Sequence, residues 1–318
     1  MDNYIGLSGK HILLYESGSG LDRTISCRLK ELGASITSFR IENAEDVESC
    51  FKEMVNEDGA FDGFVFSITH SDFRPLQFVK PNLVNNPFSL SGKRVLVTGA
   101  SSGIGMTTAI ECSRMGAQVI VTGRNEERLQ STFNAMSDGK HQIVVADLTK
   151  EDDVTSLLDS IEPVDGVVLC AGQGVVIPLK MATRKRFDPI FEVNYFAPVE
   201  LLRQMNKKRL LNDGCSLVFV ASIGGIDSIT VGNAVYGASK AAINSTMKFF
   251  ALELAHKKIR ANSVCPGMVN TRMIKDGALS SEQHRADMEK NDYPQSRDIP
   301  LILHFLGLVR PNPGFGSS

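Results

Sequence analysis

A glycine-rich turn, placed between an apolar run and a helical pattern, limits most strongly the folds that this chain can adopt. The turn reads TGASSGIG over residues 98–105 and directly follows the apolar run 94–98. Glycines allow a tight turn and let the backbone approach a pyrophosphate, whose charge faces the free N–H groups of the next helix. Such a turn can also be purely structural, so its context decides. We predict nucleotide contacts from Gly99, Ser101, Ser102, Gly103, Ile104 and Gly105.

The context is a regular alternation of apolar runs with helical patterns. The apolar runs lie at residues 94–98, 119–122, 142–146, 166–169 and 217–220. Strands of parallel sheets are apolar nearly throughout because helices cover both of their faces. The sequence therefore predicts the α/β class, with a Rossmann-like, doubly wound parallel sheet and helices on both faces.

The beginning of the chain resembles the start of this pattern. GKHILL at residues 9–14 is similar to GKRVLV at 92–97, and DGFV at 62–65 is similar to DGVV at 165–168. The second pair is offset by about 20 residues more than the first, so the first copy lacks a block between its second and third strands. We predict a degenerate, partial Rossmann-like βαβ unit over residues 1–86 and the main domain over residues 87–318. The proposed boundary is the polar stretch that ends at Pro87.

The turn of the first copy is unsuited to a nucleotide. Glu16 and Asp22 stand where the second copy has Gly99 and Gly105. Two carboxylates would repel a pyrophosphate, and their side chains would occupy space that the backbone needs. We therefore expect no nucleotide site in residues 1–86, whose role is then packing or the docking of a partner.

The end of the second predicted strand bears on the choice of cofactor. Residues 121–125 read VTGRN and contain no acid. An acid there would bind a ribose 2′-hydroxyl and repel a 2′-phosphate, whereas Arg124 can pair with the phosphate. Arg124 therefore favours NADP(H) over NAD(H), although it also fits a solvated arginine at a helix start. Asp147 and Leu148 end the next strand, where the aspartate suits either the adenine amino group or a turn.

Three polar residues form a candidate catalytic group. Tyr236 and Lys240 are four residues apart in a helical pattern, so they project from one face, one turn apart. A free tyrosine has a pKa of about 10, too high for a base at neutral pH, and a nearby cation lowers it. Ser222 follows the apolar run 217–220, where its hydroxyl can donate to a carbonyl oxygen. Each residue alone would be unremarkable, so the interpretation depends on their combination.

Together these motifs resemble the short-chain dehydrogenase/reductase family over about residues 92–294. The family pattern Thr-Gly-x-x-x-Gly-x-Gly is matched at residues 98–105, and Tyr-x-x-x-Lys is matched at 236–240. The family's serine is matched by Ser222, its helix asparagine by Asn194, and its Pro-Gly by residues 266–267. One departure is Cys170, which stands where the family usually has an asparagine that stabilises the central sheet.

The resemblance implies a reaction and the roles of its residues. Tyr236 is then the general acid or base, and Ser222 orients and polarises the carbonyl. Lys240 lowers the tyrosine pKa and holds the nicotinamide ribose, while Asn194 supports a water-mediated proton relay. The implied cofactor contacts also include Ala171, Gly172, Tyr236, Lys240, Pro266, Gly267 and Thr271.

The implied substrate is a small carbonyl compound or the corresponding alcohol. The closest similarity is to 3-oxoacyl-acyl-carrier-protein reductase-like enzymes, but a sugar or another small ketone fits equally well. Members of the family are usually homo-oligomers, yet the C-terminus here departs from the family pattern. The family's last strand is absent, which predicts an atypical, shortened C-terminus. It also predicts an exposed strand edge at residues 261–264 and leaves the expected homo-oligomer in doubt. The apolar run 301–309 is a poor substitute for that strand because of Pro300 and Gly307.

Composition excludes several other classes of protein. The net charge of -2 gives no electrostatic reason to expect nucleic acid or an anionic membrane. No apolar run approaches the roughly 20 residues of a membrane span, and no signal peptide is visible. The six cysteines form no C-x-x-C pair and the six histidines do not cluster, so we expect no metal and a reduced, cytoplasmic setting.

Three functions remain open at this point. The leading one is an NADP(H)-dependent oxidoreductase that reduces a ketone or 3-oxo group, or oxidises the corresponding secondary alcohol. The alternative is a catalytically impaired nucleotide-binding protein, or a degenerate relic of such an enzyme. The third is an interaction protein whose N-terminal unit docks a partner.

Overall fold

The computed structural model describes residues 11–15, 26–27, 29–31, 33–39, 63–66, 89–226, 230–267, 269, 271 and 273. The chain divides into two structural units, and the boundary between them falls between Val84 and Asn85. The glycine-rich turn and all proposed catalytic residues belong to the second unit. None of the helices in the described ranges is long and apolar enough to cross a membrane.

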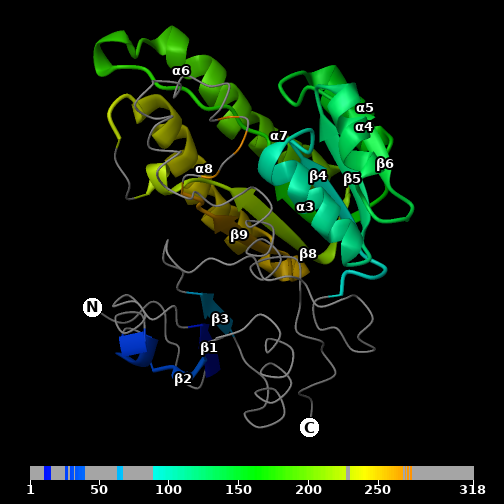
Figure 1. The fold of residues 1–318 in the computed structure, drawn as a ribbon, viewed down its shortest axis with the longest axis vertical. Helices are drawn as coiled ribbons and strands as arrows, with labels where there is room; N and C mark the ends of the chain where they lie inside the picture. Colours follow the sequence, from blue (N-terminus) through cyan, green and yellow to red (C-terminus); the bar gives the residue numbers. More distant parts are fainter. Residues whose placement is uncertain are drawn as a thin grey trace. The chain divides into compact units, whose positions relative to one another are not determined.

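The second unit is built on a parallel sheet of six strands (Figure 1). The strands are β4 (Arg94–Thr98), β5 (Gln118–Gly123), β6 (Gln142–Val145), β7 (Val164–Leu169), β8 (Leu211–Val220) and β9 (Arg260–Val264). Their order in space is β6-β5-β4-β7-β8-β9, and every neighbouring pair is parallel. This is the doubly wound order, in which the sheet grows in both directions from a central strand. The predicted fold class is therefore confirmed.

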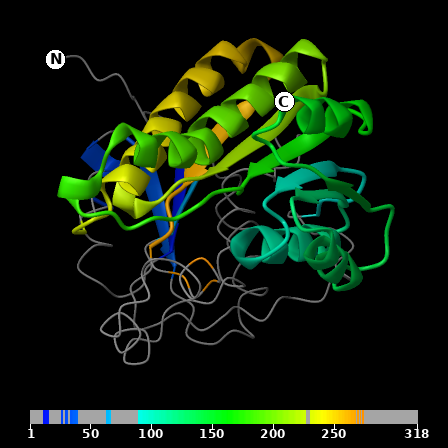
Figure 2. The ribbon, with the colours of Figure 1, turned by 90° about the horizontal axis from the view of Figure 1, so that it is seen from above.

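Helices connect the strands and cover the sheet. They are α3 (Gly103–Arg114), α4 (Glu126–Asn134), α5 (Glu151–Asp159), α6 (Arg184–Phe191), the π-helical segment η2 (Glu192–Phe196), α7 (Ala197–Lys207) and α8 (Ala234–Glu253). Short 3-10 turns, η1 (Leu179–Met181), η3 (Ile223–Gly225) and η4 (Ala255–Lys257), complete the described helices. Figure 2 shows helices on both sides of the sheet.

The alternation of side chains along each strand divides the core into two layers. In β4, Leu96 packs into one buried cluster, together with residues of α5, α7 and α8. Val95 and Val97 point the other way, into a second cluster with residues of α3 and α4. Successive side chains of a strand face opposite sides of a sheet, so an apolar run buries both faces at once. The expectation of helices on both faces is thus met by the packing.

Strand β6 differs from the expectation that all five predicted strands are covered on both faces. It lies at the edge of the sheet, and the Val145 side chain is 45% exposed. An edge strand has a neighbour on one side only, so its end remains open to solvent. Ile143 and Val144 nevertheless pack against the two clusters on opposite faces of the sheet, which accounts for the apolar residues of this strand.

The other end of the described sheet is β9, which pairs with β8. The predicted exposed edge at residues 261–264 corresponds to this position. The run 301–309 and Pro300 lie outside the described residues.

The first unit contains a parallel sheet of three described strands, β1 (His11–Tyr15), β2 (Ser35–Phe39) and β3 (Gly63–Phe66). Their order is β2-β1-β3. In the sequence repeat, β1 corresponds to β4, β2 to β5 and β3 to β7. The corresponding strands of the second unit have the same order, β5-β4-β7. Glu16 and Asp22 lie outside the described residues.

Candidate active site

A pocket lies at the carboxyl ends of the strands in the second unit. It encloses about 430 Å³ and is lined by the residues that follow β4, β5, β6, β7, β8 and β9. Strand order reverses between β4 and β7, and open α/β sheets bind their ligands in the crevice at such a point. The position of the pocket therefore follows from the topology.

The glycine-rich turn forms one wall of this pocket. Gly99 has a φ of +65°, and a Cβ atom there would lie 2.8 Å from the Ala171 backbone. Gly103 has a φ of +56° at the start of α3, where a Cβ would approach Thr271 at 3.3 Å. Glycine adopts these backbone angles without strain, and its missing side chain lets the turn pack against Ala171 and Thr271. The turn therefore offers an open cradle at a helix N-terminus, which suits a pyrophosphate.

The last glycine of the turn has a different role. Gly105 does not line the pocket, and a Cβ at this position would lie 2.4 Å from the Gly99 carbonyl oxygen. We predicted a direct cofactor contact for Gly105, whereas the structure places it beneath the turn. Its missing side chain lets α3 pack tightly against the turn that it supports.

The far end of the pocket is basic. Arg124, which is exposed, and Arg128, which is half-buried, both line it, together with Gly123 at the end of β5. Arg128 lies one turn after Arg124, at the beginning of α4, where Asn125 caps the helix by accepting a bond from the Arg128 N–H. Sequence reasoning missed Arg128, which lies in the first turn of α4, whereas Arg124 precedes the N-cap residue Asn125.

Asp147 follows β6 and lines the same end of the pocket. Its Oδ1 atom accepts hydrogen bonds from the Thr149 amide at 3.1 Å and the Thr149 hydroxyl at 2.8 Å. Burial raises the pKa of this carboxyl, but the bonds from Thr149 and the charges of Arg124 and Lys150 bring it below its usual value. The aspartate therefore makes the turn that we considered as one alternative, and the residue also lines the pocket, as the adenine alternative requires.

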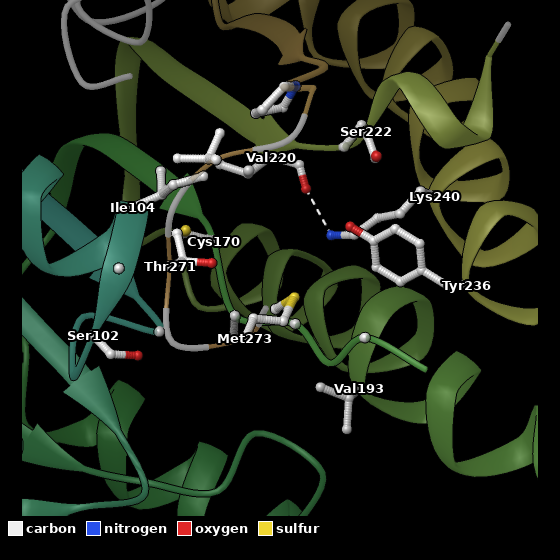
Figure 3. Close-up of a pocket in the computed structure, with 18 of the residues that line it drawn as sticks. Ser102, Ile104, Cys170, Val193, Val220, Ser222, Tyr236, Lys240, Thr271 and Met273 are labelled. Carbon is white, nitrogen blue, oxygen red and sulfur yellow. Dashed lines mark hydrogen bonds between the residues drawn. The ribbon is translucent and has the colours of Figure 1, made fainter. Parts of the chain in front are cut away.

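Ser222, Tyr236 and Lys240 gather at the opposite end of the pocket (Figure 3). Tyr236 and Lys240 project from α8 one turn apart, and the Lys240 Nζ atom lies 5.9 Å from the centre of the tyrosine ring. Ser222 follows β8, and its Oγ atom accepts a hydrogen bond of 3.2 Å from the Gly224 amide. The predicted group is thus assembled on one side of the pocket by a strand end and a helix.

The Lys240 side chain is buried and hydrogen-bonded to the backbone. Its side chain is 5% exposed, and Nζ donates a hydrogen bond of 2.7 Å to the Val220 carbonyl oxygen. Burial lowers the pKa of Lys240 to about 8. The lysine is therefore fixed against the end of β8, with its remaining N–H groups directed at the pocket.

The pKa of Tyr236 differs from our expectation. Burial raises it above its usual value, the hydrogen-bonding hydroxyl of Ser222 acts in the opposite direction, and the Cys170 thiol adds to the increase. We expected Lys240 to lower this pKa, but burial is the largest influence on it and Lys240 is not among the groups that shift it. Tyr236 is consequently a protonated group at neutral pH in this structure.

Asn194 does not line the pocket but supports it. It is 2% exposed and lies in the π-helical segment η2, a distortion that often occurs at functional sites. Its Oδ1 atom accepts a bond of 2.7 Å from the Gln173 amide, while Nδ2 donates to the Gln173 carbonyl at 3.0 Å and the Ser239 hydroxyl at 2.9 Å. Asn194 therefore ties the segment after β7 to α8, next to Lys240.

Cys170 occupies a position that Thr98 stabilises. The Thr98 hydroxyl accepts bonds from the amides of Cys170 at 3.0 Å and Ala171 at 3.1 Å, and it donates to the Val168 carbonyl at 3.2 Å. These bonds join the ends of β4 and β7 without help from the side chain at 170. Burial raises the pKa of the Cys170 thiol to about 11, so this thiol is neutral.

The pocket brings together most of the residues that we predicted. These are Gly99, Ser101, Ser102, Gly103, Ile104, Arg124, Asp147, Leu148, Ala171, Gly172, Ser222, Tyr236, Lys240, Pro266, Gly267 and Thr271. Gly105 and Asn194 lie outside its lining. Residues that sequence reasoning did not assign include Arg128, Asn233 and several apolar side chains, among them Val175, Val193 and Met273.

Comparison with known proteins agrees with this geometry. The model of the short chain dehydrogenase family matches residues 93–280, which is more than half of the chain. The chain belongs to the short-chain dehydrogenase family. It is an oxidoreductase by that membership.

Individual relatives cover the same part of the chain. A 3-oxoacyl-[acyl-carrier-protein] reductase of Rickettsia bellii is 33% identical over 223 residues, which span 68% of this chain and 90% of the relative. A glucose 1-dehydrogenase of Gluconobacter oxydans is 34% identical over 226 residues, which span 68% of this chain and 85% of the relative. The crystal structure of a 3-ketoacyl-(acyl-carrier-protein) reductase from Brucella melitensis, complexed with NADH, superposes with a TM-score of 0.60 at 26% identity. It covers 70% of this chain and 93% of that structure.

The burial of Lys240 leads to a prediction about stability. Lys240→Met should raise the free energy of unfolding at pH 7 by about 1–2 kcal/mol, because a depressed lysine pKa means that folding opposes its charge. The loss of the bond to Val220 offsets part of this gain. Between pH 8 and pH 10.5 the unfolded chain binds the additional proton, so the stability of the parent protein increases with pH and the advantage of methionine declines.

Urea unfolding at pH 7 and pH 10, without cofactor, measures this difference. Lys257→Met is a matched control, because Lys257 lies in η4 and bonds Asn206 away from the pocket. A Lys240→Met variant less stable than the parent at pH 7 would contradict the prediction.

Proposed function

We propose that this chain is an NADP(H)-dependent oxidoreductase that reduces a ketone or 3-oxo group, or oxidises the corresponding secondary alcohol. The observation that carries the proposal is the shared pocket. One end presents the cradle of the glycine-rich turn, and the other presents the hydroxyls of Ser222 and Tyr236 beside the Lys240 ammonium. A dinucleotide in this pocket would extend from the basic end to the catalytic end.

The residues present fit such a cofactor. Gly99 and Gly103 line the pocket at the N-terminus of α3, where a pyrophosphate would meet the free N–H groups of the helix. Arg124 and Arg128 supply two positive charges at the far end, which suits the 2′-phosphate of NADP(H). Lys240 and Asn194 border the position of Gly172, where a Cβ would lie 3.3 Å from both Lys240 Nζ and Asn194 Oδ1. Gly172 and Lys240 both line the pocket here, and Lys240 would hold the nicotinamide ribose.

Each catalytic residue then has a defined task in the reduction. The cofactor, when bound, supplies the hydride. Ser222 donates a hydrogen bond to the carbonyl oxygen, and Tyr236 transfers its phenolic proton to that oxygen as negative charge develops. The raised pKa of Tyr236 keeps this proton in place at neutral pH, which favours the reductive direction. Lys240 holds a positive charge near the developing phenolate, and Asn194 fixes the surrounding backbone.

The remaining assignments depend on the same proposal. We propose residues 87–318 as the catalytic domain and residues 1–86 as a partial Rossmann-like unit without a nucleotide site. A small carbonyl compound or alcohol is the proposed substrate, and a homo-oligomer is the usual assembly in the family.

The test is the oxidation of NADPH by the purified full chain in the presence of a carbonyl panel. The panel should contain methyl ketones, 3-oxo esters, hydroxy ketones and aldose sugars, with the loss of cofactor absorbance as the readout. We expect oxidation with at least one member. Tight NADPH binding without oxidation across the panel would favour the impaired nucleotide-binding protein and reject the enzyme.

A further inference from the structure

The hydroxyl of Ser239 is buried between two residues of the active site. Ser239 lies in α8, and its side chain is 0% exposed. Its Oγ atom accepts a hydrogen bond of 2.9 Å from Asn194 Nδ2 and donates one of 2.7 Å to the Tyr236 carbonyl oxygen. Buried hydroxyls generally have such partners, because water cannot satisfy them. Here both partners belong to residues for which the family resemblance implies a part in the reaction.

The chemistry of these groups fixes the direction of each bond. A carbonyl oxygen only accepts, so the Ser239 proton must point to Tyr236 and a lone pair of Oγ must face Asn194. That lone pair requires a donor, so the Asn194 amide turns Nδ2 toward Ser239. Its Oδ1 atom then accepts from the Gln173 amide at 2.7 Å. The orientation of the Asn194 amide is therefore set from two sides.

The same bonds connect three elements around the pocket. Gln173 follows β7, Asn194 lies in the π-helical segment η2, and Ser239 lies in the second turn of α8. The bond from Ser239 to the Tyr236 carbonyl reaches back to the first turn of α8, from which the phenol projects. A misplacement of about 1 Å can cost roughly 100-fold in rate, so the position of that turn matters for proton transfer.

Lys240 is anchored in a different way. Its Nζ atom donates a bond of 2.7 Å to the Val220 carbonyl oxygen at the end of β8, which does not involve Ser239. Loss of the Ser239 hydroxyl should therefore displace Tyr236 more than the Lys240 ammonium. We expect the transfer of the proton to suffer while the binding of the cofactor is maintained.

We propose that Ser239 is a positioning residue for proton transfer, which couples the Asn194 amide to the turn of α8 that carries Tyr236. The Ser239 side chain does not line the pocket, so it acts through Tyr236 and not on the substrate. The inference rests on the proposed function, in which Tyr236 donates the proton. It also gives the Asn194 side chain a task, since this amide holds α8 in place through Ser239.

The first experiment removes the hydroxyl with Ser239→Ala. This variant leaves Asn194 Nδ2 with its bond to the Gln173 carbonyl and breaks the connection to α8. With the best carbonyl of the panel, kcat should fall about tenfold, while the NADPH dissociation constant changes by less than about twofold. The solvent deuterium isotope effect on kcat should increase, because proton transfer from a displaced phenol is slower. A purely structural role would lower the amount of folded enzyme and leave this isotope effect unchanged.

Ser131→Ala is the matched control. The Ser131 hydroxyl also donates to a carbonyl of the preceding turn, that of Glu127 at 3.0 Å, but on the exposed side of α4. This variant should retain the kcat and the isotope effect of the parent. Parent values of both quantities in Ser239→Ala as well would overturn the proposal.

A double-mutant cycle tests the coupling between Ser239 and Asn194. Residues of one hydrogen-bond network have effects that do not add, whereas independent residues reduce the rate by the same factor in either background. Ser239→Ala should therefore cost less than about threefold in kcat when Asn194→Ala is already present. An undiminished tenfold loss in that background would show that Ser239 acts without Asn194 and would contradict the proposed coupling.

A titration that needs no turnover keeps the proposal testable if no carbonyl is reduced. The chain has five tyrosines and no tryptophan, so ultraviolet absorbance reports phenolate formation, and the difference from Tyr236→Phe isolates Tyr236. Burial raises the pKa of Tyr236 in the parent. A loosened first turn of α8 admits water, so this pKa should fall toward its ordinary value in Ser239→Ala and stay raised in Ser131→Ala.

The titration separates failure of this inference from failure of the proposed function. A shifted pKa without turnover of any carbonyl would reject only the proposed function, whereas an unchanged pKa in Ser239→Ala would reject the role of Ser239. Should Ser239→Ala melt well below the parent, Ser239→Cys replaces it. Cysteine keeps the shape but offers only a weak S–H donor, so kcat and the tyrosine pKa should change in the same directions, by less.

Discussion

Tyr236→Phe is expected to lower turnover at least ~100-fold while NADPH still binds, because it removes the proposed proton donor and little else. The ring remains to pack in the half-buried site, and the Lys240 bond to Val220 is unaffected. General acid–base catalysis contributes about 10²–10⁴-fold, so the loss should lie in kcat and not in the cofactor affinity. Steady-state rates with the best carbonyl of the panel, and NADPH titration by fluorescence, measure the two quantities separately.

The pH profile of the parent enzyme adds a second readout. Because burial raises the pKa of Tyr236, the proton should be present throughout the neutral range, and the reduction rate should fall only as pH rises through that elevated pKa. The oxidation of the alcohol needs the phenolate, so its rate should increase with pH over the same range. Tyr195→Phe is a suitable control, since this tyrosine contacts Thr246 outside the pocket. Near-normal turnover of Tyr236→Phe would exclude Tyr236 as the acid.

Local patterns predicted the parts of this site that depend on neighbouring residues in the sequence. The strand, glycine turn and helix at residues 94–114 occupy consecutive positions, so the turn could be recognised directly. Tyr236 and Lys240 share one helix, and their spacing of four residues fixes their common face. The observed strand order accounts for the position of the pocket, which lies at the switch point between β4 and β7.

Contacts between distant segments could not be predicted in this way. The bond from Lys240 to Val220 depends on how closely α8 approaches the end of β8, and that distance is set by packing. Burial of the phenol raises the tyrosine pKa, whereas spacing alone suggested that Lys240 would lower it. Gly105 was assigned to the cofactor because it belongs to the motif, whereas the close approach of Gly99 shows a packing role. Asn233 carried no signal in the sequence, because an asparagine before a helix usually caps it.

A change of cofactor preference is the second large effect that we expect. NADPH should bind more tightly than NADH to the parent, and Gly123→Asp combined with Arg124→Ala should reverse this order. A charge-assisted hydrogen bond to a phosphate contributes about 1.5–3 kcal/mol, or roughly tenfold to a hundredfold in affinity. A Cβ at residue 123 would lie 3.5 Å from Ser101 Oγ and 3.7 Å from Leu129, which is ordinary contact, so an aspartate fits without displacing the turn. Its carboxylate would then accept bonds from the ribose hydroxyls and repel a 2′-phosphate.

Calorimetry gives the dissociation constants of both cofactors in the parent and in each variant. These constants separate the effect of removing Arg124 from the effect of adding an aspartate at residue 123. Arg124→Ala alone should weaken NADPH and leave NADH nearly unchanged, because it removes a phosphate partner and supplies nothing for a ribose hydroxyl. Arg128→Ala should act in the same direction, since its side chain lines the same end of the pocket. Arg114→Ala is the matched control, because that guanidinium pairs with Glu111 on the surface of α3.

The salt dependence gives an independent check: NADPH affinity should decline more steeply with ionic strength than NADH affinity, as expected for an exposed cation that pairs with an additional phosphate. Equal affinities of the parent for the two cofactors would show that neither arginine reads the 2′ position.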